Sequence, residues 1–530
     1  LSLNLDFKRI SLIFSFLALG LIFLIDYTPS LLVLGLTSVF YLIFLLANHS
    51  YGLKRDNKSI ALMLICFSIV AIIGFSFNLP KSFISFPHEV TLNYNMSWQI
   101  VTDSLKSNLI LGSGPGTFFH NFSKFRQADF NLDPLWQIRF DRPLGYFAEI
   151  LSTIGILGFL AYLILVLVAL NKAMILKTEI LIFPLLAMLI GQAYYYQNTT
   201  SSFIFWFWLA MIAGLCSKIK ENKISFILNK ETLRGRIMAF VGIIVISLIS
   251  LFGIFFISRV CFADYFYKQS SKKSVGEEKI VLLKKAILIN PYFSGYYITL
   301  SQAFLNNALS ESQKPVKDNQ KIFKLVVEAT NSANKATQLS PNWVMTWQTL
   351  GMIYQEVLGL VVGVEDWGIK SFEKAIALEP TNPVFYSKLG KIYFAKHELD
   401  KAEEQFIKAR VLKPDFSEPQ FFMSLIKEEQ GDIKGAIKSL ERLQVFYPLD
   451  LDIIFQLGRL YFNQGETDKA IIQFQNVLEI NPNHLDGLYS MALALEKKGD
   501  RAEALAYIKK ALALSPENQI LEKKFEDLKN

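Results

Sequence analysis

Residues 383–414 read PVFYSKLGKIYFAKHELDKAEEQFIKARVLKP and decide the fold of the second half of the chain. The stretch ends on one of five prolines that recur at a constant interval, Pro380, Pro414, Pro448, Pro482 and Pro516. Between the prolines, small and large apolar residues return at fixed places, which in this copy are Tyr386, Leu389, Gly390, Tyr393, Ala402, Phe406 and Ala409. Small residues let two helices approach and large ones fill the space between neighbouring pairs, so the pattern predicts an all-α array of stacked copies.

This pattern, with its period of about 34 residues, resembles the tetratricopeptide repeat family over about 260 residues. The resemblance implies an α-solenoid over residues 259–516, with five clear copies and two degenerate ones that end at Pro291 and Pro341. The polar residues 517–530 are expected to form a capping helix. The concave groove of such an array is expected to take a protein partner.

The first half of the chain is far more apolar. Overall, 52% of the residues are hydrophobic, 19% are charged and the mean hydropathy is +0.32, which predicts membrane-spanning segments. Runs that approach the roughly 20 residues needed for a bilayer occur at about residues 10–25, 30–47, 59–79, 144–170, 180–196, 202–215 and 237–258. We therefore expect residues 1–258 to form a polytopic transmembrane helical bundle of about seven helices. Because the chain begins at Leu1 rather than Met, we also expect a truncated N-terminus.

The distribution of basic residues predicts the orientation. Lys and Arg lie in alternate short loops, at Lys8, Arg9, Lys54, Arg55, Lys58, Lys172, Lys177 and a cluster within residues 218–236. Such loops stay on the cytoplasmic side, which places the loop 80–143 and the repeats outside the cytoplasm. The expected localisation is the cytoplasmic (inner) membrane, multi-pass. These loops account for the net charge of +8, so no nucleic-acid partner is expected.

Cysteine usage excludes two classes of protein. Cys66, Cys216 and Cys261 are too few for a disulfide scaffold and too far apart in sequence for a zinc site. We expect no metal site and no other cofactor.

The outer loop contains a helix followed by a glycine turn. Residues 97–109 are expected to form an interfacial helix with Trp98, Val101 and Leu105 on one stripe. The turn 111–118 follows, with Gly112, Gly114 and Gly116. A dinucleotide-binding turn would follow a strand, so that function is rejected. A sharp reversal with a glycine at positive φ is expected instead.

Five residues around this turn can carry chemistry: His120, Arg126, Arg139, Arg142 and Glu149. Guanidinium groups bind phosphate oxygens bidentately and stay charged. Glu149 follows Arg142 by two helical turns, so both lie on nearly one face. Structural alternatives remain open: the arginines can anchor to lipid headgroups, His120 can pack between aromatic neighbours, and Glu149 can pair with Arg142.

Four short stretches occur in an order that resembles the signature of the O-antigen ligase and polymerase superfamily: residues 97–100 (SWQI), 111–118 (LGSGPGTF), 146–151 (YFAEIL) and 155–158 (GILG). The resemblance covers residues 95–170, approximately, and implies a membrane glycosyltransferase. Members move a glycan from a polyprenyl-diphosphate carrier to a lipid or protein acceptor outside the membrane, without metal or nucleotide. The three arginines would then bind the diphosphate, Trp98 and the turn glycines would contribute to substrate binding, and Glu149 or His120 would act as the base.

The chain departs from that family at two places, one of them Asn93, Tyr94 and Asn95, where members often have an arginine a few residues before the tryptophan. Many members have a His-Asn pair just before the span that holds the glutamate, where this chain has Leu144 and Gly145. A second function therefore stays open, a non-catalytic membrane-anchored scaffold whose repeats recruit partners for envelope glycan assembly.

Overall fold

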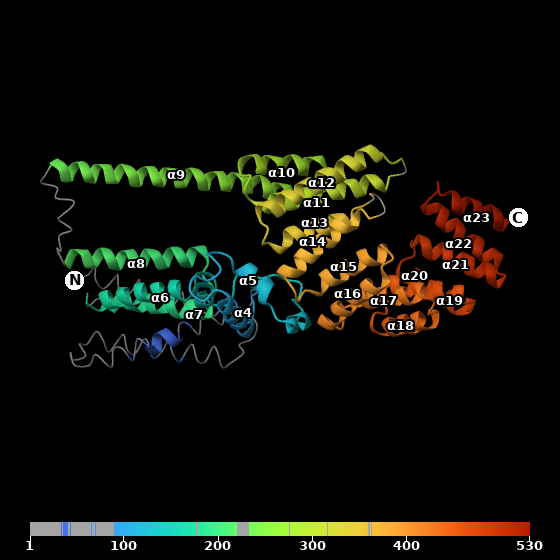
Figure 1. Ribbon diagram of the computed structural model, residues 1–530, viewed down its shortest axis with the longest axis horizontal. Helices are drawn as coiled ribbons and strands as arrows, with labels where there is room; N and C mark the ends of the chain where they lie inside the picture. The colour runs from blue at the N-terminus through green and yellow to red at the C-terminus, as the bar shows by residue number, and fades with distance from the viewer. Residues whose placement is uncertain are drawn as a thin grey trace, which may run out of the picture. The chain divides into compact units, whose positions relative to one another are not determined.

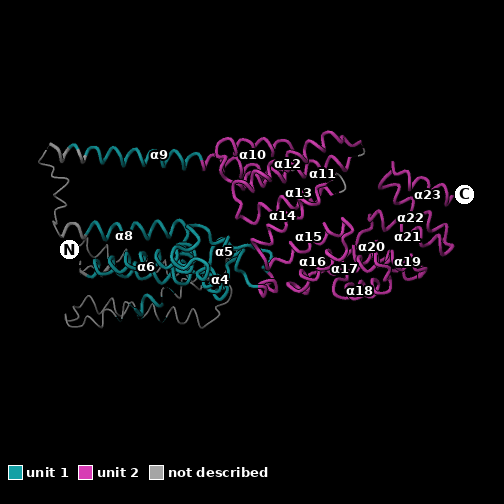
Figure 2. The backbone as a smooth tube through the Cα atoms, in the orientation of Figure 1, with its two compact units in different colours: residues 1–127, 135–259 teal, residues 128–134, 260–530 magenta. Residues whose placement is uncertain are grey.

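The computed structural model describes residues 90–175, 179–219, 233–274, 276–314, 316–358, 361 and 363–529, with scattered positions between 33 and 69. In this part of the chain every regular element is helical (Figure 1). The chain separates into two compact units (Figure 2). Unit 1 comprises residues 1–127 and 135–259, and unit 2 comprises residues 128–134 and 260–530.

Unit 2 consists of helices packed in consecutive pairs. The pairs are α11 with α12, α13 with α14, α15 with α16, α17 with α18, α19 with α20, and α21 with α22, and α23 packs on α22. The helices are α10 (Glu277–Ile289), α11 (Ser294–Ser312), α12 (Asn319–Leu339), α13 (Val344–Glu356), α14 (Glu365–Leu378), α15 (Pro383–Ala395), α16 (Leu399–Leu412), α17 (Ser417–Glu429), α18 (Ile433–Phe446), α19 (Leu451–Asn463), α20 (Thr467–Ile480), α21 (Leu485–Lys498), α22 (Arg501–Leu514) and α23 (Gln519–Lys529). The expected all-α repeat array is confirmed.

The packing within each pair follows from the recurring small residues. A Cβ added to Gly390 of α15 would lie 2.7 Å from the Phe406 ring of α16, and one added to Gly458 of α19 would lie 2.8 Å from the Phe474 ring of α20. The glycine thus lets the first helix rest directly on the aromatic ring of the second. The same glycine–phenylalanine contact occurs in different copies. The small and large residues that recur in the sequence therefore mark the positions where the two helices of a pair pack together.

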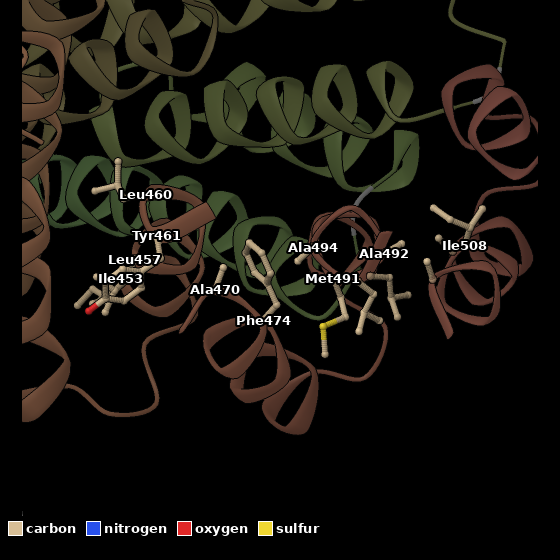
Figure 3. Close-up of a cluster of buried hydrophobic side chains, with 14 of the residues drawn as sticks. Ile453, Leu457, Leu460, Tyr461, Ala470, Phe474, Met491, Ala492, Ala494 and Ile508 are labelled. Atoms are coloured by element: carbon tan, nitrogen blue, oxygen red, sulfur yellow. The ribbon is translucent and has the colours of Figure 1, made fainter. Parts of the chain in front are cut away.

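The core of the array is continuous from one pair to the next. Side chains of α19, α20, α21 and α22 form one buried cluster, shown in Figure 3. Phe474 belongs to this cluster and is 1% exposed, and Met491 and Ile508 extend the cluster toward the C-terminus. Each pair therefore buries its apolar face against its neighbours, as a solenoid requires.

A half-buried carboxylate joins two consecutive pairs. Glu418 of α17 accepts hydrogen bonds from the Ser387 hydroxyl (2.6 Å), the Lys388 ammonium (3.2 Å) and the Lys391 ammonium (3.1 Å), all on α15. Burial acts to raise the pKa of Glu418, but the hydroxyl and the two cations outweigh it and lower the pKa below 4.5. A carboxyl with a depressed pKa stabilises the fold above its unfolded-state pKa and loses that contribution as the pH falls through the folded-state pKa.

Glu418→Gln is therefore expected to lower the thermal midpoint of the repeats at neutral pH. The difference from the native chain should shrink in acid, where Glu418 itself becomes protonated. Circular dichroism melts of the full chain at both pH values measure this. Glu404→Gln, at an exposed pair with Lys408 on α16, is the control and should change little at either pH. A difference that does not depend on pH would contradict the electrostatic account.

Unit 1 contains α4 (Tyr94–Ser107), α5 (Phe118–Phe125), α6 (Tyr146–Ile175), α7 (Glu179–Tyr194), α8 (Thr199–Ile219) and most of α9 (Leu233–Ser271). Within the described residues, two helical segments are long and apolar enough to cross a membrane, Tyr146–Met174 and Phe240–Ser271. The apolar helices Ile182–Tyr194 and Thr199–Leu215 are shorter.

The expected polytopic bundle of about seven spanning helices is wrong for the structure as described. Hydropathy measures composition, whereas spanning also needs a helical segment of sufficient length. Two of the expected spans contain apolar helical segments of only 10–17 residues, and α7 also contains Pro184. The expected spans at about residues 10–25, 30–47 and 59–79 lie outside the described residues apart from scattered positions.

Candidate functional site

Helix α4 forms one wall of the candidate site. Its N-terminus is capped by Asn93, whose side chain accepts a hydrogen bond from the Met96 N–H. The buried face is Met96, Ser97, Ile100, Val101 and Ser104. The expected stripe of Trp98, Val101 and Leu105 is thus shifted by about one residue, because polar Ser97 and Ser104 bond to the backbone and can be buried.

Helix α6 begins beside α4 and contains a break. The Leu144 N–H donates to the Ser97 hydroxyl (2.9 Å), which joins the start of α6 to the buried face of α4. At Gly155, with φ 71° and ψ −172°, the backbone leaves the helical conformation and then resumes it. A break of this kind leaves carbonyl groups before it and N–H groups after it without intrahelical partners.

The glycine turn supplies those partners. The N–H groups of Ser113 and Gly114 donate to the carbonyls of Ser152 (3.3 Å) and Thr153 (2.7 Å). In return, the N–H groups of Ile156 and Leu157 donate to the carbonyls of the two residues that precede the turn, Leu109 (3.1 Å) and Ile110 (3.2 Å). The turn and the broken helix therefore interlock through their backbones, which satisfies the groups that the break exposes.

Two glycines make this contact sterically possible. A Cβ on Gly112 would lie 2.5 Å from the Thr153 carbonyl carbon, and one on Gly155 would lie 2.4 Å from the Ile110 oxygen. Gly114 and Gly116 also have positive φ, 111° and 68°, so the expected reversal is confirmed. Gly116, by contrast, faces open space. Of the three predicted substrate-binding glycines, Gly112 serves packing, Gly114 lies within ordinary contact distance of the Thr117 side chain, and Gly116 has open surroundings.

A buried amide that the sequence did not single out supports the interlock. Asn121 of α5 is 5% exposed, and its side-chain amide donates to the Ser113 hydroxyl (2.7 Å) and the Ser152 carbonyl (3.2 Å). The Ser113 and Thr117 hydroxyls lie 2.6 Å apart. No spacing rule would have identified Asn121, because its partners come from a turn and a helix that are distant in sequence.

The three predicted arginines lie in different environments. Arg126 is 2% exposed, donates to the Trp136 carbonyl (3.1 Å) and lies 6.0 Å from the Phe122 ring. This burial gives Arg126 contacts that position the loop. Arg139 is half-buried, and it has partners of its own.

Arg142 is the arginine best placed to bind a ligand. Its guanidinium lies 4.1 Å from the centre of the Tyr196 ring and 3.3 Å from the Asp141 carboxylate. Its side chain is 40% exposed. Stacking on the ring orients the guanidinium while its outer edge remains open to an anion.

Glu149 and Arg142 act on each other electrostatically. Arg142 and Asp141 are the charged groups that influence the half-buried Glu149 carboxyl in the first turn of α6. The main-chain carbonyl of Glu149 accepts from the Thr153 hydroxyl (2.6 Å), so the backbone here is fixed independently of the carboxyl.

His120 and Trp98 each pack against a neighbouring aromatic ring. The His120 ring packs on Phe119 with centroids 3.9 Å apart. Trp98 is half-buried and tilts against Tyr94, at 6.1 Å between ring centroids. Together with Asn95, Gln99 and Thr102 it lines a shallow hollow of about 380 Å³ on α4.

The structure explains the departure from the His-Asn pair. Gly145 has φ 95°, and a Cβ there would lie 2.8 Å from the Ala193 oxygen. The neighbouring Tyr146 N–H donates to the Tyr195 carbonyl (3.2 Å). Backbone from the end of α7 thus fills the space that an asparagine side chain would need.

Comparison with known proteins identifies the repeats. Models described as tetratricopeptide repeat match residues 371–404 and 455–519. The chain therefore carries tetratricopeptide repeats, as its periodic proline series predicts.

Individual relatives match over part of the chain. A tetratricopeptide repeat-containing protein of Methanocaldococcus jannaschii, MJ1428, is 28% identical over 29% of this chain and 29% of its own length. The human protein O-mannosyl-transferase TMTC3 is 22% identical over 47% of this chain and 29% of its own length. The chain spans less than a third of the length of each. This chain also aligns with the crystal structure of a tetratricopeptide repeat protein from Parabacteroides merdae. The alignment includes 52% of this chain and the whole of that protein's chain, with 14% identity and a TM-score of 0.41.

Proposed function

We propose that this chain is a membrane-attached glycosyltransferase of the O-antigen ligase type. It would transfer a glycan from a polyprenyl-diphosphate carrier to a lipid or protein acceptor on the outer side of the cytoplasmic membrane. The observation that carries the proposal is the placement of Arg142, held over the Tyr196 ring at 4.1 Å and located shortly before the helix whose first turn carries Glu149. A fixed cation can stabilise an anionic leaving group, and a carboxylate can accept the proton of a hydroxyl nucleophile.

The reaction assigns a role to each group. The acceptor hydroxyl oxygen forms a bond to the anomeric carbon, the bond from that carbon to the diphosphate oxygen breaks, and the diphosphate leaves with the bonding electron pair. Arg142 and Arg139 bind the diphosphate oxygens and stabilise the charge that develops on them. Glu149 accepts the proton of the hydroxyl, for which His120 is the alternative base.

Two features support attachment to a membrane. Segments Tyr146–Met174 and Phe240–Ser271 are long and apolar enough to span it. The second exposes large apolar side chains, with Phe252 71% exposed, a surface that water does not favour. Arg142 lies just before the first segment and Glu149 lies in its first turn, where a carrier diphosphate at headgroup level can reach them. The basic loops favour an extracytoplasmic position for the repeats, which would recruit the acceptor.

The names of two relatives are consistent with glycan transfer. TMTC3 of human and Tmtc3 of Drosophila melanogaster are protein O-mannosyl-transferases that match this chain over part of their length.

The test measures carrier binding and transfer separately. The full chain in lipid nanodiscs is titrated with undecaprenyl diphosphate, and transfer is followed in membranes that contain a carrier-linked glycan. Arg142→Ala should weaken binding of the lipid diphosphate by about 10-fold to 100-fold, since a charge-assisted hydrogen bond contributes ~1.5–3 kcal/mol. Glu149→Gln should leave binding unchanged and abolish transfer.

Arg410→Ala, at an exposed arginine of α16, is the matched control and should change neither quantity. Transfer that survives the combined replacement of Arg139, Arg142 and Glu149 would exclude the proposed site. Normal envelope glycan with that triple variant would instead favour the scaffold function, in which the repeats alone act.

A further inference from the structure

One short segment of the loop belongs to the repeat array. Residues Ala128–Pro134 are part of unit 2, although the chain on both sides of them belongs to unit 1. The segment contains a turn of 3-10 helix, η2 (Ala128–Leu132). Phe130 is 4% exposed and Asn131 is fully buried, so the segment is packed rather than merely adjacent.

Asn131 bonds to two consecutive inter-repeat turns. Its side-chain amide donates to the Thr381 carbonyl (2.9 Å), just before α15, and to the Leu412 carbonyl (3.0 Å), at the end of α16. Its main-chain carbonyl accepts from the Lys413 ammonium (2.7 Å). Both amide hydrogens and the backbone oxygen are therefore used in specific contacts with the array.

Lys413 is an unusual residue for its place in the repeat. Its side chain is 8% exposed, and its ammonium also pairs with Asp415 at 3.0 Å. Burial of a cation is costly unless partners surround it, and here a carbonyl of the loop is one of them. The residues that precede the five regularly spaced prolines are Glu379, Lys413, Tyr447, Asn481 and Ser515, so Lys413 is the only cation among them.

The next repeat shows what the loop segment replaces. Tyr447 occupies the place in its repeat that Lys413 occupies one repeat earlier, and its hydroxyl donates to the Asp415 carbonyl. Asp415 occupies the position in its repeat that Thr381 occupies in the preceding repeat. The Asp415 carbonyl is therefore hydrogen-bonded by a side chain of the array itself, Tyr447. One repeat earlier, Asn131 of the loop satisfies the equivalent carbonyl from outside the array. The contact therefore occupies a definite place in the repeat geometry.

We propose that Asn131 and Lys413 form a clasp through which the repeat array holds the arginine-bearing loop, and that both are positioning residues for the transfer reaction. This proposal rests on the proposed function. Arg126 precedes Asn131 closely in the chain and Arg139 follows it closely. At no more than about 3.6 Å per residue, a fixed Asn131 restricts each arginine to a limited volume. The array thereby acts on the loop itself, in addition to any acceptor that it binds.

The test uses the full chain in detergent micelles and two variants that remove different halves of the clasp. Asn131→Ala removes both amide donors, and Lys413→Met removes the ammonium while keeping a long side chain. Each should raise the hydrogen-exchange rate of the amides in residues 128–134 at least tenfold, while α19 and α20 exchange as in the native chain. Lys408→Met, at an exposed lysine of α16, is the control and should change neither the exchange of residues 128–134 nor that of α19 and α20.

Transfer by the same variants separates positioning from simple structural support. Both should lower kcat for transfer from undecaprenyl-diphosphate-linked glycan while KM for the acceptor stays within twofold. Unchanged exchange in residues 128–134 would overturn the clasp, and faster exchange with unchanged kcat would overturn its positioning role. If the native chain shows no transfer, the proposed function fails, whereas the exchange result still decides whether the clasp exists.

Discussion

Gly155→Ala is expected to destabilise unit 1 by at least about 3 kcal/mol, because the backbone there combines φ 71° with ψ −172°, a region that is essentially restricted to glycine. The added methyl group would also lie 2.4 Å from the Ile110 oxygen, so the turn would have to move away. That movement would break the hydrogen bonds between residues 109–114 and residues 152–157. Thermal unfolding of the detergent-solubilised full chain, followed by tryptophan fluorescence, measures the loss.

Gly116→Ala provides the matched comparison. Gly116 also has positive φ, 68°, but an added Cβ would contact nothing within 4 Å. The expected cost is therefore only the backbone strain, about 1 kcal/mol. Hydrogen exchange should increase at residues 109–114 in Gly155→Ala and remain unchanged there in Gly116→Ala. Equal effects of the two substitutions would show that the interlock does not control the stability of unit 1.

Phe474→Ala is expected to cost about 3–5 kcal/mol of repeat stability, the usual range for removal of a buried aromatic side chain. Phe474 is 1% exposed and packs against Gly458 on one side and Phe455 on another. Because a solenoid is stabilised by contacts between neighbouring pairs, the loss should spread to α21 and α22 rather than stay in α20. Chemical denaturation followed by circular dichroism measures the change in free energy.

Phe446→Ala is the control for the chemistry of the substitution. Phe446 ends α18 and is 78% exposed, so its removal should change stability by less than about 0.5 kcal/mol. If both substitutions had similar effects, the cluster in Figure 3 would not be the stabilising core of the array.

The repeat array is the part of the molecule that could be predicted from the amino-acid sequence. Its helices depend on local periodicity, and its packing depends on contacts within one or two repeats, such as Gly390 with Phe406. The helical periodicity and the packing residues recur in each repeat, so each copy strengthens the prediction of helix pairs in the others. Positive φ in the glycine turn was likewise predictable, because few other residues adopt that conformation.

The candidate site was predictable only in outline. Arg142 and Glu149 were expected on nearly one helix face, which is wrong: α6 begins at Tyr146 and Gly145 has φ 95°, so Arg142 lies before the helix that carries Glu149. The support of Arg142 by the Tyr196 ring was not predictable, since the two residues are far apart in the chain. The burial of Arg126 was equally inaccessible, because a guanidinium in a loop gives no sign of whether it faces solvent or the Trp136 carbonyl.

The number of spanning helices was overestimated for a physical reason. A run of apolar residues registers the same hydropathy whether the helix is long, short or broken. The shorter apolar helices are Ile182–Tyr194 and Thr199–Leu215, whereas α6 keeps its length although it is interrupted at Gly155. That interruption also gives no hydropathy signal, because it depends on carbonyl and N–H partners from residues 109–114. Only the fold reveals those partners.

The amino-acid sequence by itself therefore determined the helical repeats, their period and the type of residue at each packing position, since all of these are set by neighbours close in the chain. Tertiary structure alone decided that α6 is interlocked with the glycine turn and that Asn131 bonds to turns 250 and 281 residues away. Contacts over such separations depend on where whole helices come to lie, and no local pattern of side chains encodes that position.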